Sequence, residues 1–322
     1  MSAGLYRDIR RSLIVPYFSE RRTGSFSPLR YPGGKGKLAK FMIELIRENG
    51  LSDGTYIEPY AGGAAIAWEL LLKGIMRRVE INDVSAPVHA FWDAALNRTD
   101  DFCRKIAKVP VTVEEWDRAK AIYAAPDQHD TLDLGFAFFF LNRTNRSGVL
   151  NGGIIGGRAQ TGNYKIDVRY NKADLIERIT QIARLRSRIS LTRLDAMDFI
   201  RDGQERWRSS ALVYLDPPYW GAGQSLYLNA YKRDDHAEVA SSVLDLKVEN
   251  WIVSYDDVRP IHDLYGTTPK LQYSLNYSAH RKTRGAEVMF FSDGLVVPQM
   301  ERPLAESLRT RLAAPEVSGK PM

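Results

Sequence analysis

Hydrophobic and polar positions along the chain predict a strand–helix pattern in two separated parts. The run "YIEPYAGGAAIAWELLLKG" reads as a short strand from Tyr56, a glycine turn and a helix over residues 64–73. Between the strand and the helix, the apolar residues change from a continuous run to helical spacing. Residues 76–83, "MRRVEIND", predict a second strand, and Ser85 can cap the next helix. Strands that alternate with helices indicate a parallel sheet with covering helices.

The pattern changes over residues 97–188, where strand signals are weak. A capping box of Thr112 and Glu115 predicts a helix that runs to about residue 125. Two more helices are predicted in "DTLDLGFAFFFLNR" and "KADLIERITQIARLRSRI", with a polar, glycine-rich loop between them. We interpret this region as a helical insertion in an α/β core.

The strand–helix pattern resumes after residue 188. "ISLTRLDAMDFI" predicts a strand and a short helix, and "ALVYLDPPY" and "NWIVSYDD" predict two more strands with a helix over residues 234–246 between them. Strand-like runs around a basic loop in residues 270–292 predict an antiparallel hairpin. The expected fold is α/β, a mostly parallel, doubly wound (Rossmann-like) sheet with a late antiparallel hairpin and a helical insertion.

These patterns divide the chain into four parts. Residues 1–28 form a basic arm, and residues 29–96 and 189–297 form the core. Residues 97–188 form the insertion, and residues 298–322 form a polar tail that is expected to fray. The arm is expected to be solvated, with contact to nucleic acid as the alternative. Specificity for a substrate is expected in the insertion.

Composition narrows the class of protein. The chain has 322 residues, 44% hydrophobic and 26% charged, as in ordinary globular proteins. Its net charge of +6 fits an anionic partner such as nucleic acid. With Cys103 as the single cysteine and 5 histidines, an internal disulfide is excluded and no metal is expected. Since no apolar run is long enough to span a membrane and no secretory signal is visible, we expect a cytoplasmic protein.

Polar residues follow three of the predicted strands. Glu58, Gly62 and Gly63 follow one, Asp83 the next and Asp216 a later one, and the carboxyl ends of parallel strands are where ligands bind. Glycine lets the backbone approach a ligand closely. Asp83 lies 21 residues after Gly62, the spacing of an acid that binds ribose hydroxyls, although a turn residue that caps a helix is the alternative. Without a dinucleotide fingerprint or a phosphate loop, a nucleoside without a phosphate chain is the expected ligand.

Five short motifs occur in a fixed order along the chain. They are "RYPGGK" (30–35), "EPYAGGAA" (58–65), "IND" (81–83), "DF" (198–199) and "DPPY" (216–219). Together they resemble the DNA adenine methyltransferase (Dam) family, of the type with the glycine turn before the DPPY motif. "FFFLNRTNRSG" and "NYSAHRKTRGAEVMF" are similar to that family's insert and late hairpin, so the resemblance covers about residues 29–292.

The resemblance implies an enzyme that transfers a methyl group from S-adenosyl-L-methionine to the N6 amino group of adenine in specific DNA sites. S-adenosyl-L-homocysteine would be the product. The residues implied to bind the cofactor are Tyr31, Lys35, Glu58, Tyr60, Gly62, Gly63, Asp83, Asp198 and Phe199.

Each part of the cofactor has an implied partner. Tyr31 and Lys35 would border its methionine end, Asp83 would hold the ribose, and the glycine turn would line the middle. Asp198 would bind the adenine amino group, with Asp195 as the alternative, because "DAMDF" offers two acids.

Two positions depart from the family pattern. Ala64 stands where relatives often carry glycine, and Tyr31 stands where they often carry tryptophan.

The resemblance gives the "DPPY" segment a catalytic role, whereas paired prolines alone could simply end a strand. The exocyclic amino group of adenine is a poor nucleophile, because its lone pair is delocalised into the ring. The carboxylate of Asp216 and the carbonyl of Pro217 would accept its two N–H groups, and Pro218 would stiffen this arrangement. Tyr219 would stack on the base, which must be flipped out of the duplex to be reached.

Basic residues in the insertion and the late hairpin are the implied contacts to double-stranded DNA. They are Arg143, Arg146, Arg158, Arg281 and Lys282. Each alone is more simply a solvated charge, but two clusters that flank a base pocket favour phosphate or base-edge contacts. A cognate restriction endonuclease is a candidate partner. N4-cytosine methylation, adenine methylation in RNA and a non-catalytic DNA-binding relic of the fold remain the alternatives.

Overall fold

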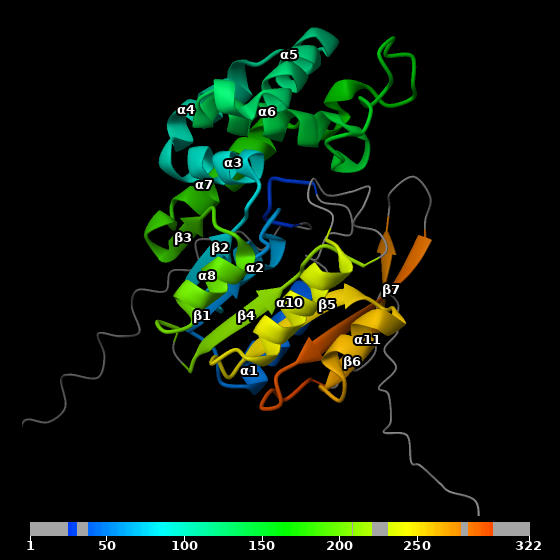
Figure 1. The fold of residues 1–322 in the computed structure, drawn as a ribbon. Helices are drawn as coiled ribbons and strands as arrows, with labels where there is room; N and C mark the ends of the chain where they lie inside the picture. The colour runs from blue at the N-terminus through cyan, green and yellow to red at the C-terminus, as the bar shows by residue number, and fades with distance from the viewer. Residues whose placement is uncertain (1–24, 31–37, 208, 221–230, 278–282, 299–322) are drawn as a thin grey trace, which may run out of the picture.

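One seven-stranded sheet organises the protein, in the order β3-β2-β1-β4-β5-β7-β6 (Figure 1). The computed structural model describes residues 25–30, 38–207, 209–220, 231–277 and 283–298. The strands are β1 (Thr55–Glu58), β2 (Arg78–Asn82), β3 (Ile189–Thr192), β4 (Ala211–Leu215), β5 (Trp251–Asp256), β6 (Lys270–Tyr277) and β7 (Thr283–Phe291).

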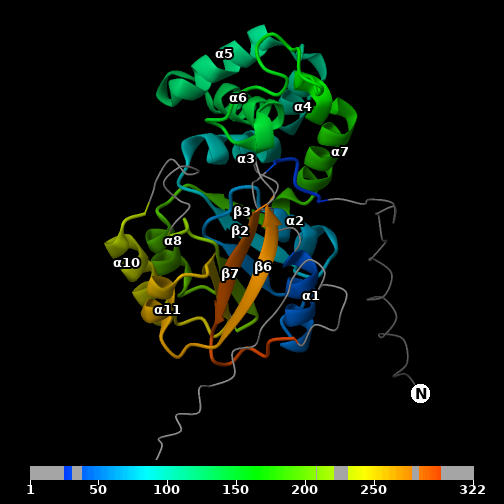
Figure 2. The same ribbon diagram turned by 90° about the vertical axis from the view of Figure 1, so that its right-hand side faces the viewer.

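The α-helices cover both faces of this sheet and one end of it. They are α1 (Ala39–Glu48), α2 (Ala65–Leu72), α3 (Ala86–Asn97), α4 (Thr99–Lys108), α5 (Val113–Ala124), α6 (Thr131–Thr144), α7 (Lys172–Ala183), α8 (Ala196–Gly203), α10 (Arg233–Leu244) and α11 (Arg259–Tyr265). Figure 2 shows α8, α10 and α11 on one side of the sheet and α1 and α2 on the other, with α3 to α7 gathered beyond the sheet.

The strand directions confirm the predicted fold. Strands β3, β2, β1, β4 and β5 are parallel, whereas β7 runs antiparallel to both β5 and β6. The chain runs outward from β1 to β3 and then returns to place β4 on the other side of β1. The carboxyl ends of β1 and β4 therefore lie side by side, and such a switch point opens a crevice for a ligand in α/β sheets.

The two faces of the sheet bury alternate residues of each strand. Tyr56 and Tyr214, with ring centroids 6.4 Å apart, pack on the side of α1 and α2. Their neighbours Ile57 and Val213 pack on the side of α8, α10 and α11. Because successive side chains of a strand point to opposite faces, both neighbouring positions must be apolar in a sheet that helices cover on each side.

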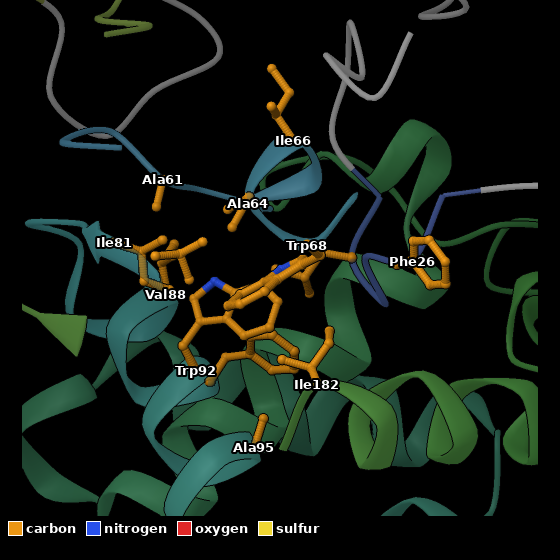
Figure 3. Close-up of a cluster of buried hydrophobic side chains, with 14 of the residues drawn as sticks. Phe26, Ala61, Ala64, Ile66, Trp68, Ile81, Val88, Trp92, Ala95 and Ile182 are labelled. Carbon is orange, nitrogen blue, oxygen red and sulfur yellow. The ribbon is translucent and has the colours of Figure 1, made fainter. Parts of the chain in front are cut away.

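Aromatic packing joins the insertion to the core. Phe91 of α3 stacks on Phe139 of α6, with ring centroids 5.6 Å apart and an interplanar angle of 7°. Trp92 of α3 contacts Trp68 of α2, with ring centroids 4.7 Å apart (Figure 3). The apolar run of α6 and the aromatic residues of α2 and α3 are thus parts of one core.

Most helices lie where the apolar spacing predicts them, and the predicted cap of α5 is present, because the Thr112 side chain accepts a bond from the Glu115 N–H. Helices α1, α4 and α11 were not predicted. In α4 only Phe102 and Ile106 of the ten residues are buried, and the others are mostly polar. Among the described helices, none combines the length and apolar character needed to cross a bilayer.

Gly135 permits the close approach of α6 to α3. A Cβ atom at this position would lie 2.5 Å from the carbonyl oxygen of Ala90 and 2.8 Å from the Cα of Phe91. We expect Gly135→Ala to lower the free energy of unfolding by about 1–3 kcal/mol, because overpacking outweighs the higher helix propensity of alanine. Urea unfolding would measure this change.

Gly294→Ala is the matched control, because nothing lies within 4 Å of a Cβ at Gly294. Its unfolding free energy should stay within about 0.5 kcal/mol of the wild type. Equal effects of the two substitutions would contradict the backbone contact as the reason.

Candidate active site

Polar side chains gather at the carboxyl edge of the parallel strands. Glu58 ends β1, Asn82 ends β2 and Asp256 ends β5, while Asp83 and Asp216 follow β2 and β4 directly. These strands are neighbours in the sheet, so the structure brings the predicted acids to one edge.

The Asp83 carboxylate accepts hydrogen bonds from two backbone N–H groups, one of which belongs to the glycine turn. Asp83 Oδ2 accepts the N–H of Gly62 at 2.8 Å, and Oδ1 accepts the N–H of Ser85 at 2.9 Å. Gly62 and Ala64 both have φ of +46°, so the turn has two left-handed positions. Burial raises the pKa of Asp83 to about 6, although the two N–H donors act to lower it.

Asn82 connects the ends of three strands from a buried position, with 1% of its surface exposed. Its amide nitrogen donates to the carbonyl oxygens of Pro59, at 3.1 Å, and Leu194, at 3.0 Å. Its amide oxygen accepts from the N–H of Leu194, at 2.9 Å, and the hydroxyl of Thr192, at 2.8 Å. Sequence reasoning noted Asn82 at the strand end but not this role.

Glu58 is a buried acid at the end of β1, with 5% of its surface exposed. Burial, and then the negative charge of Asp216, raises the pKa of Glu58 well above its usual range. Its Oε2 has no hydrogen-bond partner among the described residues. A buried polar atom without a partner is costly, so this oxygen is suited to a polar or cationic ligand group.

The "DPPY" segment is fixed from β5. Asp216 Oδ1 accepts the hydroxyl of Ser254 at 2.7 Å, and the Ser254 and Tyr214 hydroxyls are 2.9 Å apart. Beyond the segment, the N–H of Trp220 donates to Asp256 at 2.9 Å. Ser254 is fully buried and was missed from the sequence, although a serine inside the apolar run "WIVSY" was a signal for it.

The rest of the segment is set into the core. Pro217 and Pro218 are buried, and Tyr219 is partly buried against the cluster on the α8 and α10 side of the sheet.

Aromatic residues and a histidine pack against one another beside the "DPPY" segment. The hydroxyls of Tyr60 and Tyr231 are 3.1 Å apart, and the Tyr231 ring meets His236 at 5.6 Å between centroids. His236 also packs against Trp220, with centroids 5.0 Å apart. Burial raises the pKa of Tyr231, and the nearby charge of Asp195 adds to that shift. Asp195 therefore lies on the same side of the site as Tyr60.

The two acids of "DAMDF" have different surroundings. Asp195 is the N-cap of α8, where its Oδ1 accepts the N–H of Met197 at 2.8 Å. Asp198 lies one turn further along α8, with its side chain 51% exposed and paired with Arg201 at 2.5 Å. Phe199 points into the core and contacts Trp207.

The predicted DNA-binding residues are not equivalent. Arg143 donates to the carbonyl oxygens of Arg169, at 2.8 Å, and Pro28, and burial lowers its pKa to about 9. Arg146 donates to the carbonyl oxygen of Ile154 at 3.4 Å. Arg146 and Arg158 are both exposed, and Arg158, with 64% of its side chain exposed, forms a bidentate pair with Asp117.

Some predicted positions lie outside the described residues: Tyr31, Lys35, Arg281 and Lys282. Among the residues that the structure does describe, no three His, Cys, Asp or Glu side chains are grouped so that they could hold a metal ion.

The chain is similar in sequence or in structure to several methyltransferases. The Type II methyltransferase M.MjaIII of Methanocaldococcus jannaschii is 22% identical over 223 residues, which cover 64% of this chain and 73% of that protein. A SAM-dependent methyltransferase from Agrobacterium tumefaciens aligns in structure with a TM-score of 0.37 and 11% identity, over 79% of this chain and 61% of that one. The rRNA methyltransferase aviRa from Streptomyces viridochromogenes aligns with a TM-score of 0.36 and 14% identity, over 81% and 86% of the two chains.

The family match is more extensive and confirms the resemblance. Residues 31–282, which contain the glycine turn, the insertion and the "DPPY" segment, match one family along most of the sequence. The chain belongs to the D12 class N6 adenine-specific DNA methyltransferases.

Proposed function

We propose that this adenine-specific DNA methyltransferase binds S-adenosyl-L-methionine across the ends of β1, β2 and β3 and methylates a flipped adenine beside β4. The observation that carries this proposal is the adjacency of the glycine turn and Asp216 at the switch between β1 and β4. The methyl donor and the methyl acceptor would then be held next to each other, which makes the reaction between them effectively unimolecular. S-adenosyl-L-homocysteine would leave as the product.

The residues of this edge fit the cofactor. Asp83 accepts the Gly62 N–H of the glycine turn with Oδ2 and the Ser85 N–H with Oδ1, and each carboxylate oxygen has a second lone pair for a ribose hydroxyl. The buried Oε2 of Glu58 would gain a partner from the polar part of the cofactor. When bound, the cofactor supplies an electrophilic methyl group on a sulfonium sulfur.

For the adenine amino group of the cofactor we favour Asp195 over Asp198. The negative charge of Asp195, at the start of α8, adds to the raised pKa of both Tyr231 and Tyr60. The Asp198 carboxylate is instead paired with Arg201. The Asn82 amide also fixes Leu194, the residue directly before Asp195. Phe199 supports this helix from the core side.

Asp216 is the proposed acceptor for the amino group of the substrate adenine. The hydroxyl of Ser254 donates to Asp216 Oδ1 and so fixes the carboxylate plane. One amine N–H would bind Asp216 and the other the carbonyl of Pro217, which makes the nitrogen lone pair more available for the methyl group. Tyr219 would stack on the base, and base flipping is needed because the amino group is enclosed in the duplex.

The insertion, residues 97–188, is the proposed region for recognition of the DNA sequence. Arg158 is suited to this role because its guanidinium is exposed. Arg143 and Arg146 remain proposed DNA contacts, although both donate to backbone carbonyls within the protein. Since the archaeal relative is named a Type II methyltransferase, a cognate restriction endonuclease is a proposed partner.

Replacement of the catalytic carboxylate should stop the reaction without loss of the cofactor. We expect Asp216→Asn to lower the rate of methyl transfer by about a hundredfold or more, because an amide offers one acceptor and no negative charge. A tritium-transfer assay on bacterial DNA would measure the rate, and calorimetry would measure cofactor affinity. Turnover at the wild-type rate would rule out this role for Asp216.

The affinity for S-adenosyl-L-methionine should depend on pH through Asp83. Its pKa of about 6 means that the carboxylate loses its proton, and becomes the better acceptor for ribose hydroxyls, as the pH rises through 6. We therefore expect the dissociation constant to fall between about pH 5 and pH 7. Asp83→Asn should weaken binding at pH 7 about tenfold or more and remove this pH dependence. A dependence that persists in Asp83→Asn would assign it to another group.

The choice between the two acids of α8 can be tested with matched changes. Asp195→Ser keeps an N-cap but removes the charge, and we expect it to weaken S-adenosyl-L-homocysteine binding about tenfold. Asp198→Ser removes the carboxylate that pairs with Arg201 and should leave affinity within about twofold. The reverse order of effects would favour Asp198 as the adenine contact.

A further inference from the structure

Residues 25–30 lie between the insertion and the glycine turn, and we call them the N-terminal strap. Phe26 and Leu29 of the strap are buried, with 9% and 8% of their surfaces exposed. Figure 3 shows Phe26 at the edge of the cluster that contains Trp68 and Trp92. The end of the expected arm, up to residue 28, is thus packed into the protein, because apolar side chains anchor it.

The insertion holds the end of the strap through Asn142 of α6. Asn142 Oδ1 accepts the N–H of Arg30, and Nδ2 donates to the carbonyl oxygen of Arg30, both at 2.8 Å. Nδ2 also donates to the carbonyl oxygen of Gly148 at 3.2 Å. The Asn142 amide therefore satisfies both backbone groups of Arg30, from a position that is 1% exposed.

Other residues of the insertion add to this clamp. Arg178 of α7 donates to the carbonyl oxygens of Ser25 and Ser27. At Gly148, with φ of +75°, a Cβ would lie 2.5 Å from the Arg30 carbonyl oxygen, so the backbones approach closely there. The strap is thus tied to the insertion along its whole length.

The opposite side of the strap is tied to the glycine turn. The buried hydroxyl of Ser27 donates to the carbonyl oxygen of Gly63 at 2.6 Å. The neighbouring carbonyl of Gly62 accepts from the Trp92 indole at 2.8 Å, and the Gly62 N–H donates to Asp83. The orientation of the peptides in the turn therefore depends on the strap as well as on Asp83.

We propose that Asn142 is a positioning residue for the methyl donor: through the strap and Ser27, it fixes the glycine turn. The inference rests on the proposed binding of the cofactor at this turn. A residue of the DNA-recognition insertion then controls the affinity for the cofactor without contact to it. Displacement of a binding group by a fraction of an ångström is enough to lose affinity, because hydrogen bonds depend steeply on geometry.

Asn145 provides a matched control for Asn142. It is also fully buried, and its side chain makes a similar set of hydrogen bonds. All of these stay inside the insertion: Oδ1 accepts from Trp116, and Nδ2 donates to the carbonyls of Val149 and Leu150. The backbone carbonyl of Asn145 accepts from the Arg30 guanidinium at 2.9 Å, and Asn145→Ala keeps this carbonyl. Loss of the side chain should therefore destabilise the insertion without removal of a hydrogen bond to the strap.

The experiment measures binding of S-adenosyl-L-homocysteine to the full-length protein by calorimetry, below the unfolding temperature of each variant. We expect Asn142→Ala and Ser27→Ala each to weaken binding about tenfold, the order of one lost hydrogen bond. The double variant should bind no more than about twofold more weakly than either single one, because both changes break the same connection. Asn145→Ala should lower the unfolding temperature but keep affinity within about twofold.

Ser27→Ala decides the outcome if Asn142→Ala does not fold, because it removes a single hydroxyl. Wild-type affinity in both variants, with Asp83→Asn weakened, would overturn the strap inference and leave the cofactor site in place. An equal loss of affinity in Asn145→Ala would also overturn it, since the effect would then be one of stability. Full affinity in Asp83→Asn would overturn the cofactor site and, with it, this inference.

Discussion

The side-chain amide of Asn82 is the constraint on which the rest of the site depends. A primary amide has two donors and two acceptor lone pairs, and here all of them bind groups at the ends of neighbouring strands. The turn after β1 and the loop after β3 are thereby held at fixed positions relative to β2. Asp83, the next residue, then meets the glycine turn at hydrogen-bond distance. A sheet edge built in this way is rigid before any ligand arrives.

The balance of charge at this edge follows from burial. Glu58 and Asp216 end neighbouring strands, and two adjacent carboxylates in a medium of low polarity repel each other. Burial and the charge of Asp216 raise the pKa of Glu58 well above its usual range. The Asp216 carboxylate, in contrast, accepts a hydrogen bond from the hydroxyl of Ser254. Glu58 and Asp216 are both carboxylic acids, and they differ here because of their surroundings: Glu58 is buried, whereas Asp216 is hydrogen-bonded to Ser254.

The sequence predicted the features that depend on local patterns. The sheet, the glycine turn, Asp83 and the "DPPY" segment all follow from apolar runs that end in polar residues, and the structure has them at one edge. The choice within "DAMDF" depends on the point where α8 begins, because that point decides which acid caps the helix and which one pairs with Arg201. Charge alone could not separate Arg158, which is exposed, from Arg143, which folds back onto the backbone of Pro28.

Contacts between distant parts of the chain could not be predicted in this way. Ser27 lies outside the quoted motifs, and the motif that contains Asn142 does not indicate its partner. The contacts of both residues depend on how the strap passes between the insertion and the turn. The order of the elements along the chain does not fix that path.

The left-handed conformation of Ala64 has a consequence for the unbound protein. With φ of +46°, this residue adopts a backbone state that costs an alanine roughly 1 kcal/mol and that glycine reaches more easily. A glycine would also reach many other states, whereas the methyl group of Ala64, buried at 1% exposure, restricts the turn to fewer. The protein therefore gives up a little folding free energy, and the turn keeps less conformational freedom in the folded state.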